Sequence, residues 1–363
     1  MEVIVSRVQT LLDYKDLFIT QFPVGLESHV EKVIGCIQNH DTKVCMIGIW
    51  GMVGSGKTTI AKAIYNRIYR LFIGKSFVEN IRDFWDRLYR TYVDLQENFL
   101  DDVLKYKFEV ASDQMGRTII ETELCRKKLL IVLDDVNEFG QLENLCGNRE
   151  WFGRGTVIII TTRDVNVLNR LKVNYIYKMG AMNENDSLEL LSWHAFREAK
   201  PRKEFNEIAR NIVAYCGGLP LALKILGGWT MTEWKSVLSK LPVIPFAQVK
   251  EKLKISFDGL GDVEKNIFLD VCCFFIGKDR GYVTEILNAC GLHADIGITV
   301  LIERDFIKLE RNNKLEMHPL LRDMGREIIC REWPQEPHKR SRLWFHEDVK
   351  DILKKESVRT FFI

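Results

Sequence analysis

The sequence predicts an α/β fold, with a parallel-sheet domain first and smaller, mostly helical domains after it. A glycine-rich stretch, GIWGMVGSGKTT at residues 48–59, stands between an apolar run and a helical pattern. Short apolar runs recur at intervals that leave room for helices, which is typical of a parallel sheet. After Asn183 one helical pattern follows another. The length of 363 residues is enough for two or three such domains.

Composition excludes several classes of protein. The chain is 46% apolar and 28% charged, and no apolar run approaches the roughly 18 residues of a membrane span. The amino terminus lacks the pattern of a secretory signal, and the nine cysteines form no CxxC pair, so we expect reduced thiols and no zinc site. A net charge of +2 does not favour binding to nucleic acid. The basic stretch HKRSR, 338–342, is expected to be merely solvated.

The expected strands follow from short apolar runs. The first, VCMIGIW, ends at the glycine-rich stretch, and after Lys57 apolar residues recur at helical spacing. This unit is therefore strand, glycine loop, helix. The strands are expected at residues 44–50, 76–81, 129–133, 156–162 and 173–179.

The second half is predicted to be mainly helical. Cap-type residues, a glycine stop and Pro220 near a helix start delimit three helices after Asn183. The proline-containing stretch KLPVIPFAQ, 240–248, marks a boundary. Beyond it, helices precede two short extended pieces around the turn-prone RNNK, which suggests a winged-helix domain. The expected domains are a linker at 1–20, the sheet domain at 21–182, a helical domain at 183–245, the winged helix at 246–335 and a tail at 336–363.

The glycine-rich stretch satisfies the pattern G-x-x-x-x-G-K-[ST] between a strand and a helix, so the first domain is predicted to be a P-loop NTPase. Glycines let backbone N–H groups turn toward a phosphate, Lys57 reaches the β- and γ-phosphates, and the Thr58 hydroxyl binds Mg²⁺. ADP or ATP with Mg²⁺ is the expected cofactor. The nucleotide-binding residues predicted in the loop are Gly51, Gly54, Ser55, Gly56, Lys57, Thr58 and Thr59.

Two later strands end in polar residues at the edge where ligands of such sheets collect. In LLIVLDDVN, Asp134 is expected to hold the metal with Thr58, and Asp135 to polarise a hydrolytic water or simply to cap the next helix. In TVIIITTRD, Arg163 is expected to contact a γ-phosphate or to form an ion pair at the strand end. With Lys57, these are the candidate catalytic residues.

Eight motifs, in this order, resemble the NB-ARC region of plant intracellular immune receptors, in the class whose full-length members begin with a toll/interleukin-receptor domain. The resemblance covers about residues 20 to 350. The motifs are VGLESHVEKV, GMVGSGKTT, LLIVLDDVN, TVIIITTRD, SLELLSWHAF, CGGLPLALKILG, FLDVCCFF and LEMHPLLRDMGREII.

The resemblance implies a switch of the signal-transduction ATPase type, closed over ADP at rest and open with ATP. Val24 and Gly25 would lie near the adenine, Arg163 would sense the nucleotide, and Pro220 would close over it. His318 would touch the β-phosphate and latch the closed form. The cytoplasm, or the nucleus, would be the location.

The sequence departs from the family pattern at two positions. Pro319 replaces an aspartate that can cap the following helix, so we expect a lost cap, costing about 1 kcal/mol, and a switch that is leaky or whose regulation has decayed. Proline should also force His318 into extended geometry. Val53 replaces a glycine and would be strained if the loop needs a positive φ there, so weakened nucleotide binding is expected.

Several functions remain open at this stage. The first is a defence-signalling switch with slow ATP hydrolysis as a timer, in a chain expected to lack the toll/interleukin-receptor and leucine-rich-repeat domains. Full-length receptors, or further copies of itself, would be its partners. The alternatives are a continuously cycling ATPase, a degenerate scaffold that binds no nucleotide, and a nucleic-acid binder acting through the winged helix.

Overall fold

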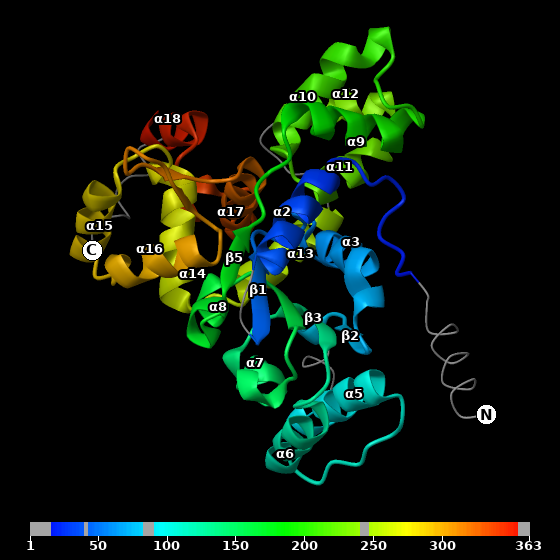
Figure 1. Cartoon of the computed structure of the whole chain (residues 1–363). Helices are drawn as coiled ribbons and strands as arrows, with labels where there is room; N and C mark the ends of the chain where they lie inside the picture. The colour runs from blue at the N-terminus through cyan, green and yellow to red at the C-terminus, as the bar shows by residue number, and fades with distance from the viewer. Residues whose placement is uncertain (1–15, 40–42, 83–90, 240–246, 355–363) are drawn as a thin grey trace. The chain divides into compact units, whose positions relative to one another are not determined.

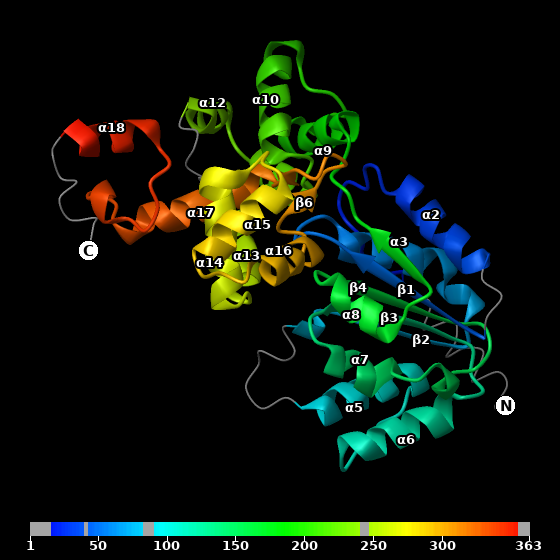
Figure 2. The same ribbon diagram turned by 90° about the vertical axis from the view of Figure 1, so that its left-hand side faces the viewer.

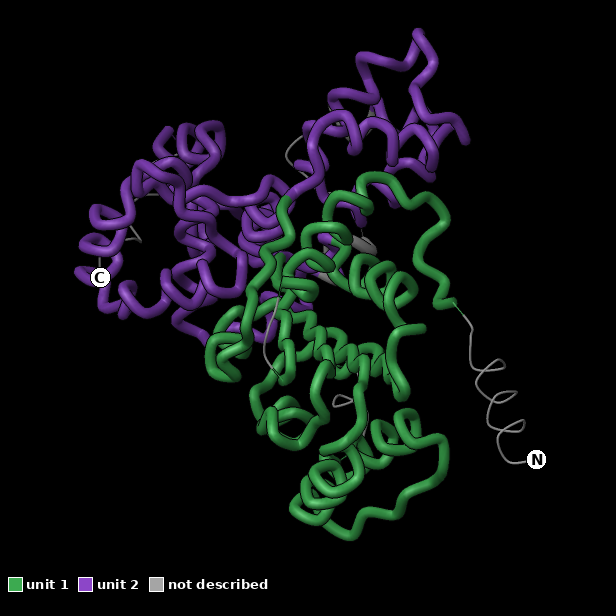
Figure 3. Tube along the Cα trace, viewed as in Figure 1, with its two compact units in different colours: residues 1–51, 56–180 green, residues 52–55, 181–363 purple. Residues whose placement is uncertain are grey.

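The computed structural model describes residues 16–39, 43–82, 91–239 and 247–354. The chain divides into two compact units, which Figure 3 colours separately. The first unit comprises residues 1–51 and 56–180, and the second comprises residues 52–55 and 181–363.

The first unit is built on a five-stranded sheet in the order β2-β3-β4-β1-β5, and all four neighbouring pairs are parallel. The predicted extents of the first and fourth strands are confirmed, whereas β2 begins and ends earlier, β3 runs further and β5 is shorter than expected. The carboxyl ends of all five strands meet at one edge, where ligands of such sheets bind. The strands are β1 Val44–Trp50, β2 Gly74–Val78, β3 Leu129–Val136, β4 Thr156–Thr162 and β5 Tyr175–Lys178.

Helices cover both faces of this sheet, as Figures 1 and 2 show. Successive side chains of β3 point to opposite faces of the sheet, and both faces are apolar. Leu130 and Val132 pack with the helices on one face, and Ile131 and Leu133 pack with those on the other. One face carries α2 Glu27–Gln38 and α3 Lys57–Ile68. The other carries α5 Tyr92–Leu104, α6 Asp113–Leu124, α7 Phe139–Cys146 and α8 Val165–Leu171. Short 3₁₀ turns, η1 Tyr69–Leu71 and η2 Arg149–Trp151, complete this unit.

The carboxyl end of β3 contains a β-bulge. Leu133 pairs with Ile160 and Val136 pairs with Thr162, so the two residues between them on β3 face the single residue Thr161 on β4. Those two residues are the aspartates of LLIVLDDVN. The second of them has a φ of 55°, in the left-handed region that aspartate tolerates better than most residues.

The second unit consists of helices and one short antiparallel hairpin. Its first part contains α9 Glu184–Phe196, η3 Lys203–Phe205, α10 Asn206–Cys216, α11 Pro220–Gly227 and α12 Met231–Ser239. Its second part contains α13 Ala247–Asp258, α14 Asp262–Asp270, the π-helical turn η4 Val271–Phe275, α15 Arg280–Ala289, α16 Ala294–Glu303, the hairpin strands β6 Lys308–Leu309 and β7 Leu315–Glu316, α17 Pro319–Glu332, η5 Pro337–Lys339 and α18 His346–Lys354.

The predicted helix ends in the second unit agree with the structure. The Asn183 side chain accepts from the Asp186 N–H and caps α9. Gly217 ends α10 with a φ of 55°, and Pro220 is the first residue of α11. Most of the expected proline-rich boundary, residues 240–246, lies outside the described residues. No helix in the described part of the chain is long and apolar enough to cross a membrane.

The basic segment 338–342 is only partly the solvated stretch that was expected, because Lys339 and Ser341 are exposed whereas its two arginines are not. Arg340 is 9% exposed, and its guanidinium lies 2.7 Å from an Asp348 carboxylate oxygen and donates to the Trp333 carbonyl. Arg342 pairs with Asp270 at 2.6 Å. The prediction was wrong for the two arginines because the carboxylates that they meet come from distant or later parts of the sequence, which a local charge count cannot locate.

Candidate functional site

The glycines of the loop adopt conformations that other residues rarely reach. Gly51, Gly54 and Gly56 have φ values of 150°, 79° and 96°. These positive values allow successive N–H groups to turn toward one point, which is the basis of phosphate binding by such loops. Val53 is not among the residues with a positive φ. The expected strain at Val53 is therefore absent, because its backbone lies outside the region that requires glycine.

The N-terminus of the helix that follows the loop can bind an anion. Helix α3 begins at Lys57, and Gly56 at its N-cap supplies no side-chain hydrogen bond to the free N–H groups of the first turn. These groups and the helix dipole attract negative charge. Lys57 is 7% exposed, and its ammonium donates to the Gly51 carbonyl at 2.8 Å, so the side chain is held against the loop itself. This set of donors fits a phosphate.

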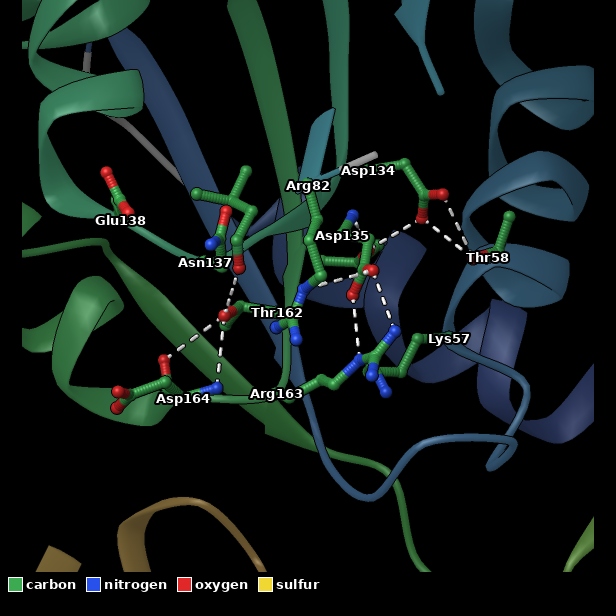
Figure 4. A network of polar contacts seen from close by, with 12 residues as sticks. Lys57, Thr58, Arg82, Asp134, Asp135, Asn137, Glu138, Thr162, Arg163 and Asp164 are labelled. Carbon is green, nitrogen blue, oxygen red and sulfur yellow. Dashed lines mark hydrogen bonds and ion pairs between the residues drawn. The ribbon is translucent and has the colours of Figure 1, made fainter. Parts of the chain in front are cut away.

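Thr58 and Asp134 meet at the metal side of the loop (Figure 4). The Thr58 hydroxyl lies 2.8 Å and 3.1 Å from the two carboxylate oxygens of Asp134, which is fully buried. The hydroxyl of Thr161 donates to the same carboxylate at 2.6 Å. Burial raises the pKa of Asp134 and the neighbouring Asp135 adds to the rise, whereas the hydrogen bonds from Thr161 and Thr58 oppose it. The carboxylate is thus desolvated but firmly oriented.

These two oxygen ligands suit Mg²⁺ better than they suit a metal ion whose ligands all come from the protein. Mg²⁺ usually keeps several waters and binds through one or two carboxylates together with phosphates. The part of the chain that the structure describes contains no group of three or more His, Cys, Asp or Glu side chains arranged to hold a metal. Thr58 and Asp134 would therefore act with a nucleotide, and the metal would supply positive charge at its phosphates.

Asp135 is engaged by arginines rather than by a helix end. The Arg163 guanidinium makes a two-point pair with its carboxylate, with N–O distances of 3.0 Å and 2.8 Å, and Arg82 lies 3.5 Å away (Figure 4). The Asp135 N–H donates to the Thr161 hydroxyl at 2.9 Å. The alternative that Arg163 forms an ion pair at the strand end is thus observed, with Asp135 as its partner. Two-point arginine–carboxylate pairs are the stronger kind.

Two of these residues, Arg82 and Thr161, were not predicted. Arg82 follows the second strand, and the rule that carboxyl ends of parallel strands share an edge is the signal that could have found it. The sequence predicts Thr161 only as part of a strand, because a β-branched residue in an apolar run favours a strand whether or not its hydroxyl has a function. No property of the local sequence separates it from a valine.

The remaining predicted residues lie in three places. Val24 and Gly25 form a turn before α2, in which the Val24 N–H donates to the Phe22 carbonyl and Gly25 has a φ of 70°. Thr59 lies in the first turn of α3. Gly54 and Ser55 belong to residues 52–55, which form part of the second unit, and Pro220 and His318 lie elsewhere in that unit. Contacts of these residues with a nucleotide stay predictions.

His318 makes two backbone hydrogen bonds within the second unit. Its Nε2 lies 3.1 Å from the Gly217 carbonyl oxygen, and its Nδ1 accepts from the Leu320 N–H at 3.2 Å. A carbonyl only accepts, so the proton is on Nε2 and the ring is the neutral tautomer. Burial lowers the pKa of His318 to about 4, which keeps it neutral near pH 7. A β-phosphate contact through Nε2 would require the Gly217 bond to break.

The expected loss of a helix cap at Pro319 is wrong. His318 is the N-cap of α17, and its ring nitrogen accepts the hydrogen bond that the family's aspartate was expected to accept. Its φ of −62° and ψ of 135° confirm the predicted extended geometry. Pro319 stands at the first helical position, where a missing N–H costs nothing. The stability argument for a leaky switch therefore fails.

We expect Pro319→Asp to change the stability of the chain very little. Proline stabilises the fold by about 0.4–1 kcal/mol because it lowers the conformational entropy of the unfolded chain. An acidic residue in a first helical turn stabilises the fold by a similar amount, so the two effects nearly cancel. His318→Ala removes both the cap and the Gly217 bond and should cost about 2 kcal/mol. Thermal melts followed by circular dichroism compare the two variants. A larger loss or gain for Pro319→Asp than for His318→Ala would contradict the capping role of the ring.

Comparison with known proteins identifies both halves of the described chain. Residues 26–200 match the NB-ARC domain, and residues 262–333 match the winged-helix domain of Roq1-like disease resistance proteins, which confirms the predicted winged helix. The Walker-type ATPase PABY2304 of Pyrococcus abyssi has a similar fold, with a TM-score of 0.56 at 14% identity over 87% of this chain and 99% of that one.

Two curated relatives extend the match across most of the sequence. Disease resistance protein RUN1 of Vitis rotundifolia is 44% identical over 91% of this chain and 25% of its own length. TMV resistance protein N of Nicotiana glutinosa is 34% identical over 96% of this chain and 31% of its own length. The chain thus spans roughly a quarter to a third of these relatives. With the loop and strand-end geometry, these matches show that the chain belongs to the NB-ARC family of plant disease-resistance proteins.

Proposed function

We propose that the chain is an ADP/ATP-dependent molecular switch of plant disease-resistance signalling. Family membership implies nucleotide binding, and the donor set of the loop supports it. In this proposal Lys57 and the first turn of α3 hold the phosphates, while Thr58 and Asp134 hold Mg²⁺. Val24 and Gly25 lie against the base, and Pro220 and His318 respond to the nucleotide from the second unit.

The observation that carries the switch, rather than a steadily working enzyme, is the contact of Asp135. A general base must be able to accept a proton from water, and its efficiency depends on being available to do so. The Asp135 carboxylate is instead held at two points by Arg163. Hydrolysis under this constraint is slow, and nucleotide identity sets the conformation for long periods. Differential affinity of the two conformations for ADP and ATP then sets their populations.

The proposed location and partners follow from the same family. The switch acts in the cytoplasm or nucleus, on full-length resistance proteins or on further copies of itself. The continuously cycling ATPase is less well supported, because Arg163 holds the Asp135 carboxylate. The scaffold that binds no nucleotide is also less well supported, because the glycines of the loop keep their positive φ values. A nucleic-acid binder through the winged helix has the low net charge of +2 against it.

The test is to purify the chain, denature it and identify the released nucleotide by chromatography. We expect mostly ADP, at close to one molecule per chain. Mostly ATP would indicate a switch biased toward its active form. An empty site in folded protein would favour the scaffold, and turnover above several per minute would favour the cycling enzyme.

A further inference from the structure

Thr161 stands opposite the β-bulge and connects the two aspartates that form it. Its hydroxyl oxygen accepts from the Asp135 N–H at 2.9 Å, and its proton goes to the Asp134 carboxylate at 2.6 Å. A bulge interrupts the regular ladder of backbone hydrogen bonds, and this hydroxyl stands in for the missing strand partner. One side chain therefore fixes both the backbone of one aspartate and the carboxylate of the other.

Water cannot easily take over this task. Thr161 is 1% exposed, and a buried donor or acceptor that loses its partner is costly. Thr58, the other hydroxyl on Asp134, is partly exposed and is expected to bind the metal through a lone pair. The Thr161 hydroxyl already accepts from the Asp135 N–H and donates to the Asp134 carboxylate, so we assign it no contact with the metal.

We infer that Thr161 is the positioning residue of the metal side, which orients the Asp134 carboxylate for Mg²⁺ by bracing the bulge from β4. The inference rests on the proposed binding of Mg²⁺–nucleotide. It explains why adjacent carboxylates have different partners, Asp134 with Thr58 and Asp135 with Arg163. Groups that orient a metal ligand typically change metal affinity 10- to 100-fold when they are removed.

The electrostatics of the site support this assignment. Burial raises the pKa of Asp134, and the hydrogen bond from Thr161 is the foremost of the effects that oppose the rise. Without that bond, the buried carboxylate would lose one of the hydroxyl donors that fix its orientation. Asp135 is adjacent and raises the same pKa, so the Thr161 hydroxyl also offsets the repulsion between the two carboxylates.

The experiment measures ADP binding to the full chain by calorimetry, first in EDTA and then over a series of Mg²⁺ concentrations. Thr161→Val keeps the shape of the side chain and removes the hydroxyl. The Mg²⁺ midpoint is the Mg²⁺ concentration that gives half of the full Mg²⁺-dependent change in affinity for ADP. We expect Thr161→Val to raise this midpoint by about 10-fold or more, and to leave the affinity for ADP in EDTA within about twofold of the wild-type value. Thr161→Ser should restore the wild-type midpoint. Thr161→Cys, a weak donor of similar size, should give an intermediate value.

Thr162 provides a matched control. It is the next residue of β4, is fully buried, and its hydroxyl also makes a donor and an acceptor bond, to the Val136 carbonyl at 2.7 Å and from the Asp164 N–H at 3.1 Å (Figure 4). None of these partners is a carboxylate. Thr162→Val should therefore lose a similar amount of stability and leave the Mg²⁺ midpoint unchanged.

Three results would overturn the inference. The first is an equal rise of the midpoint in Thr161→Val and Thr162→Val, which would mean a general effect on the fold. The second is an unchanged midpoint in Thr161→Val, and the third is a failure of Thr161→Ser to restore it. If the wild-type chain binds no ADP with or without Mg²⁺, the proposed function itself is wrong and the inference falls with it.

Discussion

Lys57→Ala is expected to empty the nucleotide site, with an affinity for ADP at least 100-fold below that of the wild-type chain, or about 3 kcal/mol. Lys57 is buried, and its ammonium lies 2.8 Å from the Gly51 carbonyl, so its charge is little screened and would act directly on a bound phosphate. Calorimetric titration with ADP, and chromatography of the nucleotide that copurifies with the chain, measure the loss.

Lys62→Ala is the control for this prediction. Lys62 lies one turn further along α3, and its ammonium pairs with Glu79 at 2.7 Å instead of with the loop. Removing it deletes the same charge from the same helix and should leave ADP binding within about twofold, because a partly exposed ion pair contributes little. Equal losses in the two variants would show that charge in general, and not the Lys57 position, draws the nucleotide to the chain.

Asp134→Asn should make the empty chain more stable and at the same time abolish the dependence of nucleotide binding on Mg²⁺. A carboxyl whose pKa is raised in the folded state costs stability at neutral pH, because folding must then bury a charge that water would solvate better. An amide keeps an acceptor for Thr58 and Thr161 and removes that cost. We expect a melting temperature higher by a few degrees, about 1 kcal/mol for a domain of this size.

The dependence on pH is the internal control. As the pH falls through the raised pKa of Asp134, the wild-type carboxyl becomes neutral too, and the advantage of the asparagine should disappear. Melting curves across this range, without metal or nucleotide, test the sign. A lower melting temperature for Asp134→Asn at pH 7, or an Mg²⁺ midpoint equal to that of the wild-type chain, would contradict the role of this carboxylate.

The strands could be predicted because buried parallel strands are continuous apolar runs. The first and fourth runs coincide with β1 and β4 as they stand, since each is bounded by residues of a different character. The end of β3 could not be predicted. Its apolar run stops at Leu133, yet the strand continues to Val136, because the hydrogen bonds that extend it come from β4 and not from the local sequence.

The candidate site was predictable where spacing alone determines the chemistry. The glycines of the loop, Lys57 and Thr58 follow from one short pattern, and Asp134 follows from the end of a strand. The partners of Asp135 did not, because they depend on which strand ends adjoin in the sheet. The cap of α17 was missed for another reason: the prediction looked for an acceptor at residue 319, whereas the ring of His318 turns back and provides one.

The bulge in β3 also keeps Val136 on the same face of the sheet as Leu133, although Val136 is three positions further along the chain. Before it, odd-numbered residues such as Leu133 face the cluster that includes α5 to α8; beyond it, the even-numbered Val136 joins that same cluster. The extra residue has shifted the parity of the strand by one. Removing either aspartate would restore strict alternation and leave the valine on the same face as Leu133, but only one carboxylate would remain at the strand end. The bulge is therefore the feature that places two adjacent carboxylates beside the site without moving the core residue that follows them.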